Sequence, residues 1–211
     1  MALKQKDGSY AVVFSGSIFT PQKLKEIGEK LDEHGVNLIK FSESQRLVVI
    51  GINPDKLGEL CRETGMEIAP AVGRVVRGVR FCPAELCPLG LQKAIEMGER
   101  LKKFEGLEMP DKLKIAISGC PNSCTEPVVR DIGLMGTKDG WTIFVGGSAG
   151  RRPRIGWKLF EKVNTEDSVK IVEKIVEYYK KNAQKGQRLG DFIESIGFEN
   201  FRRDIQYDLE N

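Results

Sequence analysis

Two short cysteine-containing runs, Cys82-Pro-Ala-Glu-Leu-Cys87 and Cys120-Pro-Asn-Ser-Cys124, organise this sequence of 211 residues. They carry four of its five cysteines, and 32 residues separate them. Residues 112–117, just before the second run, alternate apolar and other side chains as a β-strand does. The segment after the first run predicts a helix, whose expected apolar face comprises Leu91, Ile95, Gly98 and Leu101. Both runs therefore lie at the ends of elements, where their side chains can converge.

Four converging thiolates suit a soft metal centre, either iron–sulfur or zinc. Structural zinc usually takes tighter pairs, often with histidine, whereas pairs four and three residues apart suit a wider 4Fe–4S cluster. Disulfides are disfavoured because a chain of this length can form a core without them. Four unconnected core cysteines are a further alternative. The spacing favours a 4Fe–4S cluster and leaves the alternatives open.

The residues around the second run resemble a known family. Ile117-Ser118-Gly119-Cys120-Pro121-Asn122-Ser123-Cys124, the later Val145-Gly146-Gly147 and the Gly150-Arg151-Arg152-Pro153-Arg154 run are similar to motifs of the sulfite and nitrite reductases. Arg77-Gly78-Val79-Arg80-Phe81-Cys82 is similar to that family's lead into its first cysteine pair. The resemblance covers most of the chain, at the size of the small single-repeat members. One departure is that the first pair encloses four residues, where the family usually has five.

The resemblance implies two cofactors, a 4Fe–4S cluster and sirohaem. Cys82, Cys87, Cys120 and Cys124 would ligate the cluster, and Cys124 would also bridge to the sirohaem iron. Asn122 and Gly147 would help to hold the macrocycle. The implied reaction is the six-electron reduction of a small oxyanion, sulfite or nitrite.

Arginines lie beside the first cysteine pair and beside the later glycines. Arg77 and Arg80 precede the first cysteine pair, and Arg151, Arg152 and Arg154 follow the glycines. Arginine matches carboxylates bidentately and stays charged, so we expect these side chains to cradle the carboxylates that the resemblance gives to sirohaem. A solvated strand or loop face is the alternative interpretation. Arg46 is the candidate catalytic cation, because the family's arginine position is matched here by Ser44, and Arg46 would point to the same face of a strand.

Composition bounds the class of protein. Apolar residues make up 40% and charged residues 30% of the chain, with a net charge of +3, which is typical of a globular protein and does not indicate nucleic-acid binding. The N-terminal residues lack the apolar core of a signal peptide, and no run predicts a membrane span. We therefore expect a cytoplasmic protein. A homo-oligomer is left open.

The N-terminal part predicts a β-α-β-β-α order, with strands at 9–14, 36–41 and 46–52. Thr20 and Pro21 are expected to start its first helix, and Asn53-Pro54 its second, which should end near Gly65. We expect an α+β fold in which residues 1–69 form a ferredoxin-like half-domain. Residues 70–211 are expected to form a mixed α/β domain that binds sirohaem and the cluster.

The C-terminal part predicts a hairpin of strands at 129–135 and 141–145, joined by a turn at Lys138-Asp139-Gly140. A long helix should start at Asn164, with a helical tail after it. No glycine loop typical of nucleotide binding is evident, so electrons are expected from an external donor such as a ferredoxin. Two other functions remain open: a cofactor-binding electron-transfer protein without reductase activity, and a zinc-stabilised interaction protein.

Overall fold

The computed structural model of the chain describes residues 2–210, with side chains to Gln206. The chain divides into two compact units, Met1–Ala71 and Val72–Asn211. Each unit has its own sheet. No described helix combines the length and the apolar character that a membrane span requires.

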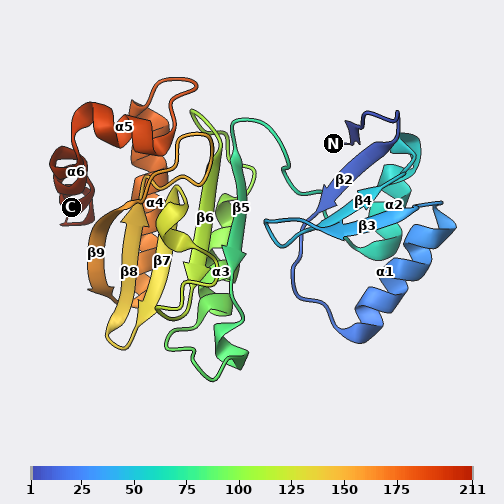
Figure 1. Cartoon of the computed structure of the whole chain (residues 1–211), viewed down its shortest axis with the longest axis horizontal. Coiled ribbons are helices and arrows are strands. Elements are labelled where there is room, and N and C mark those ends of the chain that lie inside the picture. The colour runs from blue at the N-terminus through green and yellow to red at the C-terminus, as the bar shows by residue number, and fades with distance from the viewer. Residues whose placement is uncertain (1, 211) are drawn as a thin grey trace. The chain divides into compact units, whose positions relative to one another are not determined.

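The first unit is a four-stranded antiparallel sheet with two helices (Figure 1). Its strand order is β1-β2-β4-β3. Its elements are β1 (Leu3–Lys4), β2 (Tyr10–Phe14), α1 (Pro21–Glu33), β3 (Leu38–Phe41), β4 (Leu47–Ile50), the 3₁₀ helix η1 (Pro54–Lys56) and α2 (Leu57–Thr64). Thr20 caps α1 by accepting the Lys23 N–H, and Gly65 ends α2 in the left-handed conformation. The predicted β-α-β-β-α order is confirmed.

The second unit is a five-stranded mixed sheet of order β5-β6-β7-β8-β9. Its first half comprises β5 (Val76–Phe81), η2 (Ala84–Leu86), α3 (Ala94–Leu101), η3 (Lys102–Phe104), β6 (Leu113–Ser118) and η4 (Pro127–Val129). Its second half comprises β7 (Ile132–Thr137), β8 (Gly140–Val145), β9 (Trp157–Val163), α4 (Thr165–Asn182), α5 (Leu189–Ile196) and α6 (Phe198–Glu210). β5, β6 and β7 run parallel, whereas β7, β8 and β9 are antiparallel. The α+β fold class is confirmed.

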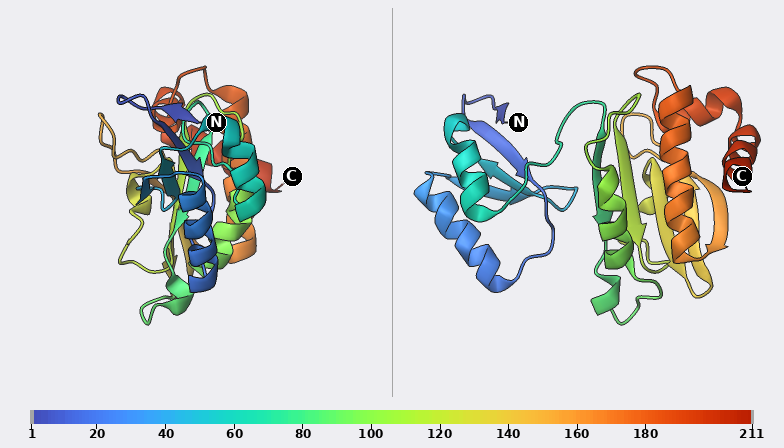
Figure 2. Two further views of the ribbon diagram at one scale, coloured as in Figure 1. Left: turned by 90° about the vertical axis from the view of Figure 1, so that its right-hand side faces the viewer. Right: turned by 180° about the vertical axis from the view of Figure 1, so that it is seen from behind.

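Helices α3 and α4 cover one face of this sheet, as the view from behind shows (Figure 2). Their buried faces join the strands in one core, which includes Met97, Ile175 and Trp141. Asn164 caps α4 by accepting the Asp167 N–H, as the sequence predicted. The segment that carries η4 lies on the opposite face of the sheet (Figure 1) and packs against β6, β7 and β8.

One expectation from the sequence needs correction, and one strand of the second unit was missed. Leu91 does not belong to the face of α3, because that helix begins only at Ala94 and Leu91 is 42% exposed. The backbone N–H of Leu91 instead donates to the Gly119 carbonyl at 2.9 Å, a contact that local periodicity cannot reveal. β9 was not predicted, and the register shifts along its pairing with β8 explain why no regular alternation marked it.

Candidate metal centre and anion pocket

The two cysteine runs begin where two neighbouring parallel strands end. Phe81, the last residue of β5, is in register with Ile117 of β6. Cys82 follows β5 directly, and its N–H donates to the Ile117 carbonyl at 3.1 Å. Cys120 follows the end of β6 by two residues. The carboxyl ends of parallel strands form one edge of a sheet and are a common place for ligand sites, so the fold brings the two runs to the same edge.

The loops after these strands are in direct contact through Gly119. Its carbonyl accepts the N–H groups of Leu91 and Gln92, both at 2.9 Å. Its own N–H donates to the Sγ of Cys82 at 3.2 Å. A Cβ at this position would lie 2.2 Å from the Cβ of Ala84 and 2.5 Å from the Gln92 carbonyl oxygen. Only glycine therefore lets the two loops approach this closely.

The four thiols of the two runs lie at two depths. Cys82 and Cys120 are buried, at 8% and 7% exposure, whereas Cys87 and Cys124 are exposed. Burial raises the pKa of the Cys82 thiol, the Gly119 N–H opposes this shift, and the charges of Cys124 and Cys120 raise the pKa further. Cys82 is thus close enough to Cys120 and to Cys124 to be affected by their charges.

The chain turns sharply on both sides of Cys124. Ser123 and Glu126 adopt the left-handed conformation, with φ of 57° and 53°, which is uncommon for residues other than glycine and costs conformational energy. A buried hydrogen bond of 2.8 Å between the hydroxyls of Ser118 and Thr125 stabilises the turn. Arg80 reaches across from β5 to the Cys124 carbonyl at 3.5 Å.

The donor set fits a polynuclear iron–sulfur centre. Cysteine thiolates are the ligands such clusters take, and backbone N–H groups that donate to sulfur help to set their potential, as Gly119 can do for Cys82. Among the described side chains, which extend to Gln206, no group of three or more His, Cys, Asp or Glu residues is placed to hold a single metal ion. All five cysteines are free thiols. The ligand roles of the four cysteines remain predictions.

A second feature of this unit is a pocket of about 340 Å³. Its walls come from the glycine-containing loop after β8, the residues just before β6 and β7, and the start of α5. It is lined by Lys112, Asp131, Gly146, Gly147, Ser148, Gly150, Arg151, Arg152, Arg154, Arg188, Gly190 and Asp191. Five of these side chains are cationic and two are acidic, so the pocket carries a positive excess that suits an anion.

The predicted arginines of the loop fall into two kinds. Ser148 and Arg154 exchange two backbone hydrogen bonds, of 2.9 and 2.8 Å, and so close a small loop that carries Arg151 and Arg152. Arg154 bonds Asp191 at 3.1 Å and Glu194 at 2.6 Å, and lies over the Trp157 ring. Arg154 is therefore engaged in fixing the loop to α5. For Arg151 and Arg152, which are exposed, no acidic partner is found among the described residues.

Sequence reasoning missed the floor of this pocket. Arg188 donates to one oxygen of Asp131 through Nε at 3.2 Å and through its terminal nitrogen at 2.6 Å. The other oxygen of Asp131 accepts the Lys114 N–H at 2.9 Å. Burial raises the pKa of Asp131, while Arg188 and this N–H oppose the shift. Arg188 lies 57 residues from Asp131 in the chain, so no local signal could have paired them.

The remaining predicted residues have varied surroundings. Arg77 lies where the register of β5 shifts, and donates to the Gly73 carbonyl at 3.3 Å. Asn122 is exposed in the turn of the second cysteine run. A Cβ on Gly147 would lie 2.6 Å from the carbonyl oxygens of Val128 and Arg130, so this glycine is required for packing. Its part in binding an anion remains a prediction.

Arg46 belongs to the first unit. It is only 4% exposed, and its side chain donates to the Pro70 carbonyl at 3.4 Å. The expected strand alternation with Ser44 is wrong, because residues 42–46 form a turn in which Gln45 has a φ of 60°. The catalytic role of Arg46 remains a prediction.

Comparison with known families matches almost the whole chain. The model of the nitrite and sulphite reductase 4Fe-4S domain matches residues 72–211, and that of the nitrite/sulfite reductase ferredoxin-like half domain matches residues 3–66. The chain belongs to the nitrite and sulfite reductase family. It is therefore an oxidoreductase of this type, and the predicted cofactor pair of a 4Fe–4S cluster and sirohaem agrees with this family.

The relatives of this chain within the nitrite and sulfite reductase family differ in length. "Sulfite reductase, assimilatory-type" from Nitratidesulfovibrio vulgaris is 34% identical over 97% of this chain and 96% of its own length. "Nitrite reductase [NAD(P)H]" from Bacillus subtilis is 32% identical over 92% of this chain, but the match spans only 24% of that protein. The crystal structure of dissimilatory sulfite reductase I shares the fold, with a TM-score of 0.83 over 93% of this chain and 68% of its own, at 15% identity.

Proposed function

We propose that this chain reduces sulfite or nitrite by six electrons, using a 4Fe–4S cluster and sirohaem that receive electrons from an external donor. The observation that carries the proposal is the joining of the two cysteine runs at the ends of β5 and β6 through Gly119. Family membership supports the reaction class. The sulfite reductase from Nitratidesulfovibrio vulgaris, which has nearly the same length, supports a catalytic unit of this size.

Cys82, Cys87, Cys120 and Cys124 would hold the cluster, and Cys124 would also contact the sirohaem iron. Bound together, the two groups would supply one-electron steps to an oxyanion at the iron. The protein's own part is to position them and tune their potentials. The left-handed residues on both sides of Cys124 and the contact from Arg80 fix the backbone that presents this thiol.

The cationic pocket suits the carboxylates of the macrocycle. Its glycines let backbone N–H groups come close to an anion, and Arg151 and Arg152 can form bidentate hydrogen bonds with carboxylates. The segment from Cys120 to Asp131 runs from the second cysteine run to this pocket, and Val128 and Arg130 contact Gly147 on the way. One short segment thus connects the proposed cluster ligands with the proposed carboxylate site.

Turnover of the anaerobically purified protein tests the proposal. A reduced viologen dye serves as electron donor, with sulfite or nitrite as substrate and sulfide or ammonium as the product measured. The proposal predicts one molecule of sulfide or ammonium for every six electrons taken from the dye. Protein that carries both cofactors but turns over neither substrate would instead support the electron-transfer alternative. Zinc without iron would support the structural one.

A further inference from the structure

Helix α3 has an unusual N-terminal cap. The residue at the cap position is Lys93, which provides no side-chain cap, although Ser, Thr, Asp or Asn is preferred there. The cap comes from Glu85, within the first cysteine run. Its two carboxylate oxygens accept the N–H groups of Ile95 and Glu96, both at 2.9 Å. These are the donors that a cap side chain ordinarily satisfies.

The loop that carries Glu85 has little other freedom. The Ala84 N–H donates to the Cys82 carbonyl at 2.9 Å, and the Cys87 N–H donates to the Ala84 carbonyl at 3.1 Å. A Cβ on Gly90 would lie 2.0 Å from the Ala84 carbonyl oxygen. The loop is therefore tightly wound, and the orientation of η2 determines where Cys87 points.

The two cysteines of this run are held differently. The Sγ of Cys82 is buried and accepts the Gly119 N–H. The Cys87 side chain is exposed, and no hydrogen bond to its sulfur is found among the described residues. The position of Cys87 thus depends on the backbone of η2. Glu85 anchors η2 to α3.

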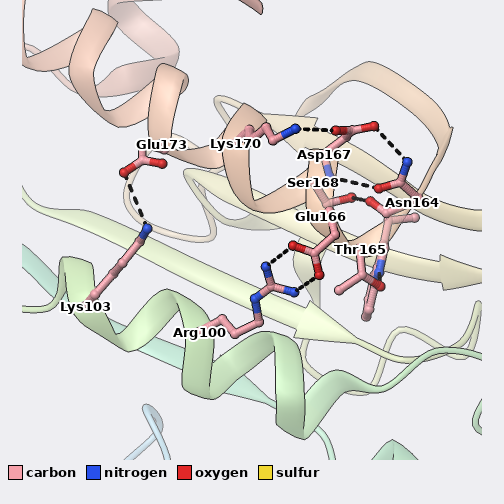
Figure 3. A network of polar contacts seen from close by, with 10 residues as sticks. Arg100, Lys103, Asn164, Thr165, Glu166, Asp167, Ser168, Lys170 and Glu173 are labelled. Carbon is pink, nitrogen blue, oxygen red and sulfur yellow. Dashed lines mark hydrogen bonds and ion pairs between the residues drawn. The ribbon is translucent and has the colours of Figure 1, made fainter.

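Helix α3 is a firm support for this anchor. Arg100 forms two hydrogen bonds of 2.6 Å with Glu166 at the start of α4, and Lys103, in η3 directly after α3, pairs with Glu173 at 3.3 Å (Figure 3). Ala94, Met97 and Leu101 are fully buried in the core. A residue fastened to the N-terminus of α3 is therefore fastened to the whole second unit.

We propose that Glu85 is a positioning residue for Cys87, holding the four-residue loop between Cys82 and Cys87 so that the exposed thiol meets the cluster. This inference rests on the proposed function, because it concerns a cluster ligand. It also explains how the shortened loop of the first cysteine pair is held in place. The carboxylate joins loop and helix through two charge-assisted hydrogen bonds, which an amide or a methyl group cannot reproduce.

The test compares three variants of the anaerobically purified holoprotein. Glu85→Ala removes both acceptors, and Glu85→Gln keeps the shape and one acceptor oxygen. Glu99→Gln is the matched control, since it makes the same acid-to-amide change on α3 and removes only an exposed ion pair with Lys102. The measurements are the rate at which a strong iron chelator bleaches the cluster absorption, the reduction potential of the cluster, and the unfolding temperature.

We expect Glu85→Ala to lose its cluster about tenfold to a hundredfold faster than wild type, the range for loss of a residue that orients a metal ligand. Glu85→Gln should be intermediate and should show a shifted potential with little change in unfolding temperature. Glu99→Gln should keep the wild-type cluster lifetime. Equal lifetimes in Glu85→Ala, Glu85→Gln, Glu99→Gln and wild type would overturn the inference and leave the proposed function standing. Wild-type protein without iron and sulfide would overturn both.

Discussion

The backbone N–H of Gly119 lies 3.2 Å from the Sγ of Cys82 and joins the loop of one cysteine pair to a thiol of the other. The two residues are 37 positions apart, and the parallel pairing of β5 with β6 brings them together. This contact makes the convergence of the thiols a property of the fold itself. It also means that a single methyl group added at Gly119 would disrupt the site.

Gly119→Ala should therefore damage both stability and cluster binding. The new Cβ would collide with the Gln92 carbonyl oxygen, which is backbone and cannot rotate away, and overpacking of this kind costs about 1–3 kcal/mol. Denaturant unfolding and the iron content of the purified protein measure the two effects. Gly28→Ala is the control, since nothing lies within 4 Å of its added Cβ in α1. Wild-type iron content in Gly119→Ala would contradict the assigned contact.

The arginines of the loop at 148–154 should separate into two classes. Arg154→Ala removes the links to Asp191 and Glu194 and the contact with Trp157, and should cost about 1 kcal/mol of stability, because these acids are largely exposed. Arg152→Ala should change stability by less than about 0.5 kcal/mol. It should nevertheless reduce sirohaem content, since an Arg–carboxylate hydrogen bond contributes about 1.5–3 kcal/mol. Thermal unfolding and the Soret absorbance per chain measure the two quantities. Full sirohaem content in Arg152→Ala would remove this residue from the cofactor site.

The contact between α3 and α4 should depend on pH. The hydrogen bonds from Arg100 lower the pKa of Glu166 from its ordinary value of 4.5. A carboxyl whose pKa is lowered on folding contributes stability at pH values above its unfolded pKa, and this is lost as the pH falls through the folded pKa. Wild type should therefore be more stable than Glu166→Gln at pH 7. The difference should shrink as the pH falls below 4.5 and disappear below the lowered pKa of folded Glu166.

Urea unfolding at a series of pH values provides this measurement. Glu177→Gln is a suitable control, because it lies on the same helix and removes only a pair of 4.0 Å within α4. A difference between wild type and Glu166→Gln that is constant from pH 7 to pH 3 would contradict the electrostatic explanation.

Local signals in the sequence predicted most elements correctly. Thr20 and Asn164 mark helix starts because each side chain accepts a backbone N–H three residues later, and Lys138-Asp139-Gly140 marks the hairpin between β7 and β8. These features depend on residues that are close in the chain. The cysteine runs were recognisable for the same reason, since each pair lies within one short loop.

The sequence could not reveal contacts between distant segments. The start of α3 at Ala94 depends on Glu85 and on the Gly119 carbonyl, so periodicity alone placed Leu91 in the helix. The predicted anion-binding role of Arg154 remains a prediction, but the sequence could not reveal that Asp191 and Glu194, 37 and 40 residues away, bond its side chain. Arg188 and Lys112 line the pocket without any local motif. The sequence shows that both residues are cationic, but it does not show where the fold places them.

Metal and cofactor content tests the central claim most directly. Anaerobically purified protein should show a sirohaem-like Soret band and red band, with roughly five irons per chain, four from a cluster and one from the macrocycle. Cys61→Ser should keep this iron, because Cys61 packs against the core of the first unit, whereas Cys82→Ser should lose it. Colourless protein that contains zinc, or a Cys82→Ser variant with the full iron and sulfide count, would contradict the account.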